Sequence, residues 1–252
     1  MPADRATHPQ VSPAPILTVR DLCTWYYSSE GLVRAVDGVN FDVHAGRTLG
    51  IVGESGCGKS VTARSILRIV EKPGKIVRGS IHLHPAHGQG ASRDLVKLVA
   101  DGPEMREIQG GDIALVFQEP MTSFSPVHTV GNQIIETIQL HDRSVTKAMA
   151  RDRAIELLQM VGIPRAERRV DEFAYQLSGG LRQRAMIALA LACDPRLLIA
   201  DEPTTALDVT TQAQILELLR RLQAERGMAI MLITHNLGVI AEMADDVAVM
   251  YL

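Results

Sequence analysis

A glycine-rich stretch that ends in Lys-Ser is the clearest chemical signal in this sequence. Residues 53–60 read Gly-Glu-Ser-Gly-Cys-Gly-Lys-Ser, which has the form G-x-x-x-x-G-K-[ST]. Its glycines allow successive amide N–H groups to turn toward a polyphosphate. Lys59 adds a positive charge for the β and γ phosphates, and the Ser60 hydroxyl is suited to bind Mg²⁺. The stretch therefore predicts a nucleoside triphosphate site.

A second glycine-containing stretch precedes another apolar segment. Residues 177–184 read Leu-Ser-Gly-Gly-Leu-Arg-Gln-Arg and lead into the apolar residues 185–193. Ser178 is a typical helix N-cap, and Gly179 and Gly180 leave backbone amides exposed at the positive end of the predicted helix. The chain thus has two predicted phosphate cradles but one lysine-bearing loop, which raises the question of whose phosphate the second one contacts.

Polar residues follow several apolar runs that read as buried strands. Gln118 ends one run, Asp201 and Glu202 end a second, and His235 ends a third. Ligands bind at the carboxyl ends of strands in open α/β sheets, so we expect these side chains at the phosphate site. Neighbouring residues on a strand point to opposite faces, so one carboxylate is expected to bind magnesium and the other to polarise water. Taken singly, each Gln or His is equally explained as a structural residue.

The pattern of the remaining chain predicts an α/β fold. Apolar residues 49–52 and the helical spacing of 61–70 flank the first loop, giving strand, loop and helix. Period-two alternation indicates extended segments at 16–19, 39–43 and 76–84. From residue 132 to about 176 the spacing is helical, which predicts a helical subdomain inserted into a nucleotide-binding core.

Composition narrows the class of protein. The chain has 252 residues, of which 46% are hydrophobic and 22% charged, and a net charge of −3 gives no argument for a nucleic-acid partner. Its three widely spaced cysteines favour a reducing compartment. No run approaches the ~18 apolar residues of a membrane span, and the start lacks a signal peptide. We expect a cytoplasmic protein with a disordered lead-in at residues 1–14.

Two smaller features leave alternatives open. The aromatic stretch 22–27 can place Tyr26 against an adenine base, or its rings can simply pack on the sheet, and the spacing favours neither. His82, His84 and His87 suggest a metal site, but no cysteine or carboxylate cluster accompanies them. A hairpin with solvated histidines explains them as well, and we favour that interpretation.

Together these motifs resemble a known family. The ordered set of motifs resembles the nucleotide-binding subunit of an ATP-binding cassette (ABC) transporter. In chain order the set is residues 53–60, Gln118, residues 177–184, Asp201, Glu202, residues 206–208 and His235. The resemblance covers nearly everything from Ile16 to Leu252, and Leu-Ser-Gly-Gly followed by Gln-Arg separates this family from other P-loop ATPases. It implies a P-loop core with an N-terminal antiparallel β subdomain and the inserted helical subdomain.

The resemblance also implies roles for particular residues. Those implied to bind nucleotide are Tyr26, Gly53, Glu54, Ser55, Gly56, Cys57, Gly58, Lys59, Ser60 and Val61. Those implied to act in catalysis are Lys59, Gln118, Glu202 and His235, while Mg²⁺ is assigned to Ser60, Gln118 and Asp201. The signature residues Ser178, Gly179, Gly180 and Gln183 would contact ATP held by a second subunit, beside a D-loop at Asp208. Two such domains would therefore have to pair head to tail.

Within the family, the sequence is most similar to the oligopeptide, dipeptide and nickel permease ATPases. The stretches that suggest this are 35–39, 53–58, 117–127 and 201–209. The resemblance implies a subunit on the cytoplasmic face of the inner membrane, attached to two permease subunits and served by an extracytoplasmic solute-binding protein. Such subunits usually continue beyond the final strand at 247–252, where this sequence ends. Either the sequence is truncated or the tail is absent, and one ATPase domain is expected at 15–252. Its core is expected at 15–118 and 177–252, and its helical subdomain at 119–176.

Other classes of P-loop protein remain as alternatives. A DNA-repair or chromosome-organising ATPase normally separates its two halves by a long coiled coil, whereas Gln118 and Ser178 are close in this sequence. A translation factor of the ABC type carries two cassettes, and this chain has one. A small-molecule P-loop kinase would lack Leu-Ser-Gly-Gly.

Overall fold

The computed structural model describes residues 14–29, 31–86, 90–119, 123–205 and 207–251. The strands are β1 (Pro15–Ser28), β2 (Gly31–His44), β3 (Thr48–Gly53), β4 (Gly74–Leu83), β5 (Arg93–Asp94), β6 (Ile113–Val116), β7 (Leu197–Asp201), β8 (Ala229–Ile233) and β9 (Asp246–Met250). The helices are α1 (Lys59–Ile66), α2 (Pro103–Gly111), α4 (Val130–His141), α5 (Lys147–Met160), α6 (Ala166–Arg169), α7 (Gly179–Ala190), α8 (Val209–Arg226) and α9 (Leu237–Met243), with short 3-10 turns at Leu95–Lys97 and Ala174–Gln176. The predicted lead-in at 1–14, apart from Ala14, lies outside the described residues, as do His87 and Ala206.

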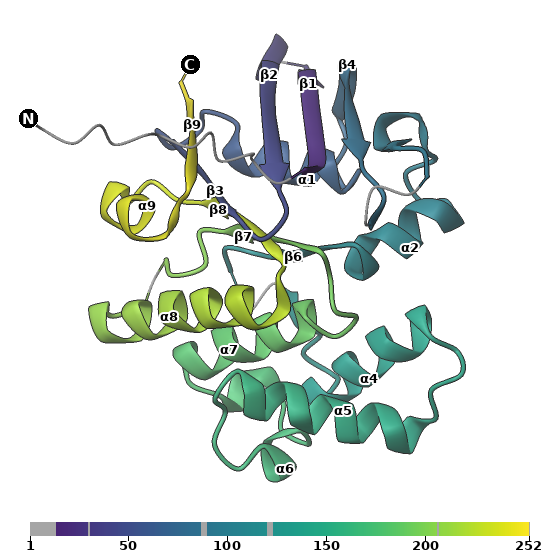
Figure 1. Cartoon of the computed structure of the whole chain (residues 1–252), viewed down its shortest axis with the longest axis vertical. Helices are drawn as coiled ribbons and strands as arrows, with labels where there is room; N and C mark the ends of the chain where they lie inside the picture. Colours follow the sequence, from purple (N-terminus) through teal and green to yellow (C-terminus); the bar gives the residue numbers. More distant parts are fainter. Residues whose placement is uncertain (1–13, 30, 87–89, 120–122, 206, 252) are drawn as a thin grey trace, which may run out of the picture.

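These elements form three layers (Figure 1). An antiparallel sheet in the order β2-β1-β4-β5 lies at one end, and a parallel sheet in the order β6-β7-β8-β3-β9 lies in the middle. Helices α4, α5, α7 and α8 cover the far side of the parallel sheet (Figure 1). The predicted α/β class, with a β part at the N-terminus and helices inserted between parts of the core, is confirmed.

The parallel sheet is buried on both faces, as continuous apolar strands require. Along β7, Leu197 and Ile199 belong to the hydrophobic core shared with the antiparallel sheet, whereas Leu198 and Ala200 belong to the core under the helices. The residues of β8 alternate between the same two cores. Two separate cores therefore hold the carboxyl ends of these strands at one edge, where the polar residues follow.

The antiparallel sheet is longer than the sequence predicts. The expected strand at 16–19 extends through the aromatic stretch to Ser28, and the one at 39–43 begins already at Gly31. Register shifts in the pairing, for example between Val19 and Leu22, interrupt the period-two alternation on which the shorter prediction rested. Tyr26 therefore lies within β1 and not in a connecting loop.

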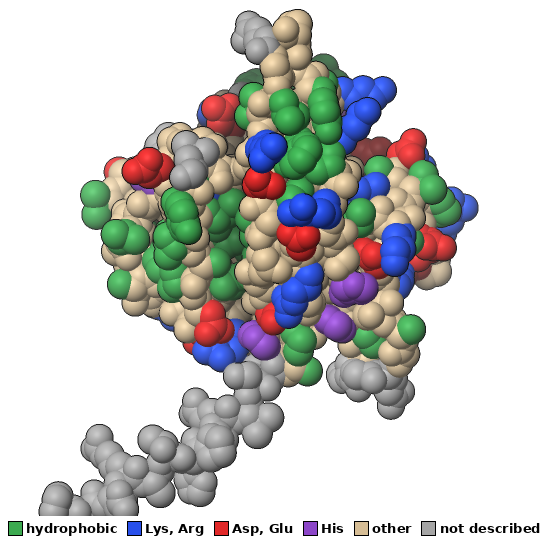
Figure 2. Space-filling view, turned by 90° about the horizontal axis from the view of Figure 1, so that it is seen from above, with side chains coloured by type: hydrophobic (Ala, Val, Ile, Leu, Met, Phe, Trp, Pro, Cys, Tyr) green, Lys and Arg blue, Asp and Glu red, His purple; other side chains and the backbone are tan. Residues whose placement is uncertain are grey.

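Threonine side chains cap α4 and α5 in the helical layer. Thr129 accepts a hydrogen bond from the backbone of Asn132 at the start of α4, and Thr146 accepts one from Met149 at the start of α5. None of the described helices combines the length and apolar character needed to cross a bilayer. On the face shown in Figure 2, basic and acidic side chains are interspersed.

Candidate nucleotide site

The first glycine-rich loop connects β3 to α1, as predicted. Gly58 occupies the cap position of α1 with φ 94°, in the left-handed region that favours glycine. A Cβ at Gly58 would collide with the carbonyl oxygen of Ala35 on β2, whereas one at Gly56 (φ 87°) would meet open space. The antiparallel sheet therefore rests directly on the loop at Gly58, and no other residue type fits there.

Lys59 is folded back over this loop. Its side chain is 5% exposed, and its Nζ donates hydrogen bonds to the carbonyl oxygens of Gly53 (2.8 Å) and Glu54 (2.7 Å). The Sγ of Cys57, which is also buried, lies 3.7 Å from the same ammonium group. The loop thus concentrates positive charge at the start of α1, where the helix dipole adds to it.

Ser60 and Asp201 meet across the sheet edge. The Ser60 hydroxyl donates to Oδ1 of Asp201 at 3.1 Å, although the two residues are far apart in sequence. Burial raises the pKa of Asp201, and the bond from Ser60 opposes that shift. A hydroxyl and a buried carboxylate side by side are hard oxygen ligands of the kind that Mg²⁺ prefers, so these two residues fit the predicted ion.

Glu202 is the centre of a separate cluster. Its Oε2 accepts hydrogen bonds from Nε2 of Gln118 (3.1 Å) and Oγ1 of Thr205 (2.8 Å), and its Oε1 lies 3.1 Å from Nδ1 of His235. Burial raises the pKa of Glu202, but the hydrogen bonds from His235 and Thr205 and the charge of Lys59 outweigh it, and the net pKa is lowered. The carboxylate is therefore ionised at neutral pH.

Two details of this cluster differ from the sequence interpretation. Glu202 does not continue the strand as assumed, because β7 ends at Asp201 and Glu202 is left-handed with φ 47°. It is this turn that separates the two carboxylates. The Gln118 amide faces Glu202, whereas it was predicted to join Ser60 and Asp201 at the magnesium ion.

Thr205 was missed by the sequence analysis. Its hydroxyl bonds to Glu202 because the chain turns immediately after β7, where Thr205 N also donates to the carbonyl oxygen of Glu202 (3.2 Å). A threonine three residues after an acidic residue in a turn is the available signal, but such pairs are common and non-specific.

The second glycine-containing stretch begins α7 at the surface. Ser178 and Gly179 are exposed, and Ser178 holds the N-cap position without a side-chain cap hydrogen bond. The next residues are turned inward: Arg182 donates to the carbonyl oxygen of Ala174 (2.9 Å), and Gln183 is 2% exposed. In this arrangement Gln183 is unavailable to a partner's nucleotide, whereas the amides at the start of α7 are available.

The D-loop and Tyr26 predictions fall on residues with local partners. Asp208 caps α8, since its carboxylate accepts from the backbone nitrogen (3.0 Å) and hydroxyl (2.7 Å) of Thr211. Tyr26 pairs with Gly74 of β4, and its ring edge lies over that glycine. This contact favours sheet packing for the half-buried Tyr26, while its predicted adenine contact stays a prediction.

His84, directly after β4, has an ordinary hydrogen-bond partner. His84 Nε2 lies 3.0 Å from the Thr18 hydroxyl, which joins β1 to the end of β4. Among the described residues, no group of three or more His, Cys, Asp and Glu is arranged to hold a metal ion.

A P-loop on a parallel sheet, with an aspartate, a glutamate and a histidine at the same edge, defines an ATPase of the cassette type. The dimeric post-hydrolysis structure of the ATP-binding cassette MJ0796, bound to ADP and Pi, is similar with a TM-score of 0.79 at 28% identity, over 93% of this chain and 94% of that one. The structure of cbiO1 from Clostridium perfringens, part of the ABC transporter complex cbiONQ, has a TM-score of 0.71 at 28% identity, over 94% of this chain and 84% of that one.

The family model described as ABC transporter matches residues 36–205, and the chain belongs to this family. It is 54% identical to the probable peptide ABC transporter ATP-binding protein y4tR of Sinorhizobium fredii, over 94% of this chain and 68% of the relative. It is 49% identical to the oligopeptide transport ATP-binding protein AppD of Bacillus subtilis, over 94% of this chain and 69% of the relative. It is 46% identical to the dipeptide transport ATP-binding protein DppD of Haemophilus influenzae, over 94% of this chain and 68% of the relative.

Proposed function

We propose that this chain is the ATP-hydrolysing subunit of an ABC importer that takes up peptides. The observation that carries the proposal is the convergence of Ser60 with Asp201, and of Glu202 with His235, at one sheet edge beside the P-loop. The printed names of the relatives, which refer to peptide, oligopeptide and dipeptide transport, support the cargo class. Nickel is the second candidate cargo, because the sequence also resembles the ATPases of nickel permeases.

At the proposed site, each residue has a distinct task. Lys59 neutralises the β and γ phosphates of ATP. Ser60 and Asp201 hold Mg²⁺. Gln118 becomes a further magnesium ligand once its hydrogen bond to Glu202 is broken. A bound Mg²⁺ would supply positive charge that offsets the charge of the phosphates. Tyr26 contacts the adenine base.

Hydrolysis at this site needs a base and a charge-stabilising donor. Glu202 aligns a water molecule and accepts its proton as the water oxygen bonds to the γ-phosphorus and the bond to the β-phosphate oxygen breaks. His235 donates to a γ-phosphate oxygen, which stabilises the charge that develops there. The two side chains already lie within hydrogen-bond distance, at 3.1 Å.

The exposed start of α7 supports a requirement for a second ATPase subunit. Ser178 makes no cap bond within its own chain, and Gly179 and Gly180 offer backbone amides at the positive end of the helix. We propose that they close on ATP held by a partner, in a homodimer or a heterodimer. The core at 15–118 and 177–252 and the helical subdomain at 119–176 would then move relative to each other.

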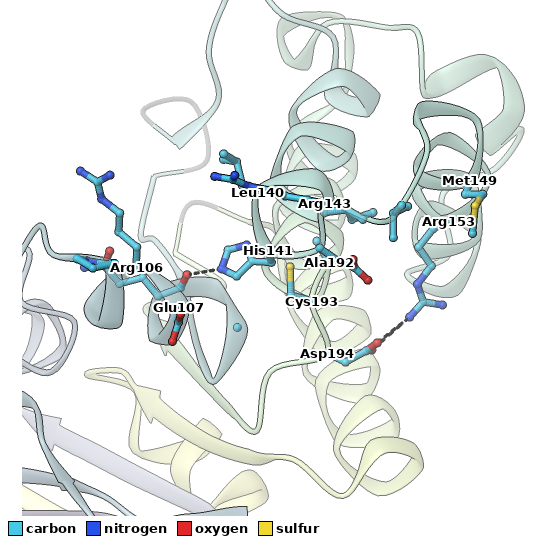
Figure 3. A pocket seen from close by; sticks show the side chains of 16 residues that line it. Arg106, Glu107, Leu140, His141, Arg143, Met149, Arg153, Ala192, Cys193 and Asp194 are labelled. Carbon is cyan, nitrogen blue, oxygen red and sulfur yellow. Dashed lines mark hydrogen bonds and ion pairs between the residues drawn. The ribbon is translucent and has the colours of Figure 1, made fainter.

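A groove between the core and the helical layer supports the proposed attachment to permease subunits at the cytoplasmic face of the membrane (Figure 3). It encloses about 1200 Å³ between α2, α4, α5 and residues 192–194. Leu140 and Met149, which line it, are 71% and 57% exposed, and Arg106 and Arg143 also line it. Such an apolar lining with cations suits a cytoplasmic segment of a membrane protein. The extracytoplasmic solute-binding protein would act through those permeases.

The cargo is tested by uptake in cells that produce Glu202→Gln in place of the normal chain. We expect loss of uptake of labelled dipeptides and oligopeptides with normal uptake of Ni²⁺. Glu217→Gln, an exposed carboxylate on α8, is the matched control and should leave uptake unchanged. Loss of Ni²⁺ uptake alone would assign the transporter to nickel, and unchanged uptake of both would overturn the proposal.

A further inference from the structure

The irregular end of α2 meets the helical layer at His141. Gln109 (φ −67°, ψ 109°) and Gly110 (φ 87°, ψ −31°) depart from helical geometry shortly before β6, the strand that leads to Gln118. A Cβ at Gly110 would lie 3.2 Å from Cε1 of His141, and one at Gly111 would lie 3.4 Å from Cδ2. The imidazole therefore rests against this glycine pair, which leaves room for it.

Hydrogen bonds run in series from the end of the P-loop helix to α4. Gln109 Nε2 donates to the carbonyl oxygen of Leu67, the C-cap residue of α1, at 2.7 Å. The carbonyl oxygen of the same Gln109 lies 2.9 Å from Nε2 of His141. His141 reaches across the groove in Figure 3 to make this contact. One glutamine and one histidine thus connect the helix that begins at Lys59 to the helical layer.

Both ring nitrogens of His141 face oxygen atoms that can only accept. Nε2 lies 2.9 Å from the carbonyl oxygen of Gln109, and Nδ1 lies 3.0 Å from that of Thr137, one turn earlier on α4. A neutral imidazole carries one N–H, so each neutral tautomer makes one bond and turns a lone pair toward the other carbonyl. Only the imidazolium donates to both.

Charged and titratable groups surround the ring from every neighbouring element. They are Arg106 and Glu107 on α2, Asp142 and Arg143 after α4, Arg153 on α5, and Cys193 and Asp194 after α7. Asp194 is paired with Arg153 (3.1 Å), and Asp142 accepts from the Ser144 hydroxyl (2.6 Å). Burial raises the pKa of the Cys193 thiol to about 11, so it is neutral. The two carbonyl oxygens are thus the direct partners of the ring.

We infer that His141 is a positioning residue for ATP hydrolysis: as an imidazolium it ties the helical layer, and with it Ser178, to the P-loop helix through Gln109. This inference rests on the proposed function. The helical layer must place the start of α7 accurately for a partner's nucleotide. A fixed contact between the layer and the P-loop helix reduces the conformational freedom that is lost when the two subunits close on ATP. Loss of a ring proton weakens this contact, because one of the two carbonyl contacts becomes repulsive.

A matched pair of substitutions separates the two bonds. The amide nitrogen of a glutamine lies where Nε2 of histidine lies, so His141→Gln keeps the contact with Gln109 and needs no added proton. The amide nitrogen of an asparagine corresponds to Nδ1, so His141→Asn keeps only the contact with Thr137 inside α4. Both variants retain polar side chains on a helix that is otherwise unchanged, and thermal unfolding checks that they fold.

The first measurement is ATPase kcat/KM of the unchanged chain and of both variants between pH 6 and pH 9. Each variant's value is divided by the wild-type value at the same pH, so that pH effects common to all three proteins cancel. We expect His141→Asn to be reduced about threefold to tenfold at pH 6, the effect of losing one charge-assisted hydrogen bond. His141→Gln should be near wild type at pH 6, with its ratio rising toward pH 9. Equal ratios for the two variants at all pH values would overturn the inference.

The second measurement is the ¹⁵N spectrum of the histidine rings. We expect both nitrogens of His141 to carry protons at pH 6, with one lost on raising the pH in step with the activity ratio. A ring that stays in a single neutral tautomer at pH 6 would overturn the inference. A wild-type chain that binds no ATP would instead refute the proposed function, so the two failures are distinguishable.

Discussion

The two glycine-containing loops of this protein begin helices in contrasting settings. The loop before α1 is enclosed: Gly58 lies under Ala35, Lys59 is 5% exposed, and Ser60 already touches Asp201. The loop before α7 is open, since Ser178 and Gly179 are exposed and Ser178 makes no side-chain cap bond. The same chemistry, amides at a helix N-terminus, is therefore complete within the chain at one loop and incomplete at the other.

This difference supports our proposal that a single chain holds one whole phosphate site and half of another. Helix amides without a lysine bind an anion weakly, which supports our proposal that the open loop depends on a nucleotide presented by a partner. The following four predictions test this difference, beginning with the largest effect.

Removal of the base at the enclosed site is expected to have the largest effect. Glu202→Gln should lower ATP turnover about 100-fold to 1000-fold while ATP binding is retained, because the shape stays and the proton acceptor is lost. Steady-state hydrolysis and ATP titration measure the two quantities. Turnover like that of the wild type would exclude Glu202 as the base, and Glu217→Gln serves as the control.

A methyl group added to the enclosed loop tests its packing. Gly58→Ala should destabilise the fold by about 2 to 3 kcal/mol and abolish ATP binding, because the Cβ combines a left-handed backbone with a collision at Ala35. Gly56→Ala shares the positive φ but meets open space, so about 1 kcal/mol is expected. Urea unfolding measures both, and similar losses in the two variants would show that the contact with Ala35 is unimportant.

The open loop should affect the association of two chains and not ATP binding to one chain. In a Glu202→Gln background, Ser178→Arg should leave ATP binding to the monomer unchanged and weaken ATP-driven dimerisation at least about tenfold, because a large cation replaces the small residue at the exposed helix start. Size-exclusion chromatography with and without Mg-ATP measures it. Ser144→Arg, on another exposed turn, is the control, and a weakened monomer affinity would show that Ser178 belongs to its own chain's site.

A surface ion pair of the helical layer should give the smallest effect. Arg151 donates two hydrogen bonds to Asp171, at 2.7 and 2.6 Å, and these lower the pKa of Asp171. Because the pKa of Asp171 is lower in the folded state, the ion pair stabilises the fold fully at pH values above the unfolded-state pKa. This stabilisation is lost as the pH falls through the folded-state pKa. Asp171→Asn should therefore cost about 0.5 kcal/mol at pH 7 and nothing in strong acid.

The check on this last prediction is urea unfolding at both pH values. Asp152→Asn, on α5 next to Arg151, is a suitable comparison. A cost that persists unchanged in acid would mean that Asp171 stabilises α5 by packing and not by its charge.

How far the sequence predicts the site depends on how local each feature is. The strand, loop and helix around residues 53–60 follow from glycine positions and apolar spacing, which act over a few residues. The strand that ends at Asp201 is equally local, as is the helix that begins after Ser178. Gln183 shows the limit: its place in the motif suggested an exposed contact, but the helix turns its side chain inward to 2% exposure.

The sequence by itself determined the residue types of the nucleotide site, the α/β class and the family, because each depends on short motifs and their order. Only the tertiary structure decided which residues meet. The strand order β6-β7-β8-β3-β9 brings Ser60 to Asp201 and Gln118 to Glu202, and the turn at Glu202 sends adjacent carboxylates to different partners. Contacts between distant segments, such as His141 with Gln109, depend on how whole layers pack, and no local pattern encodes that packing.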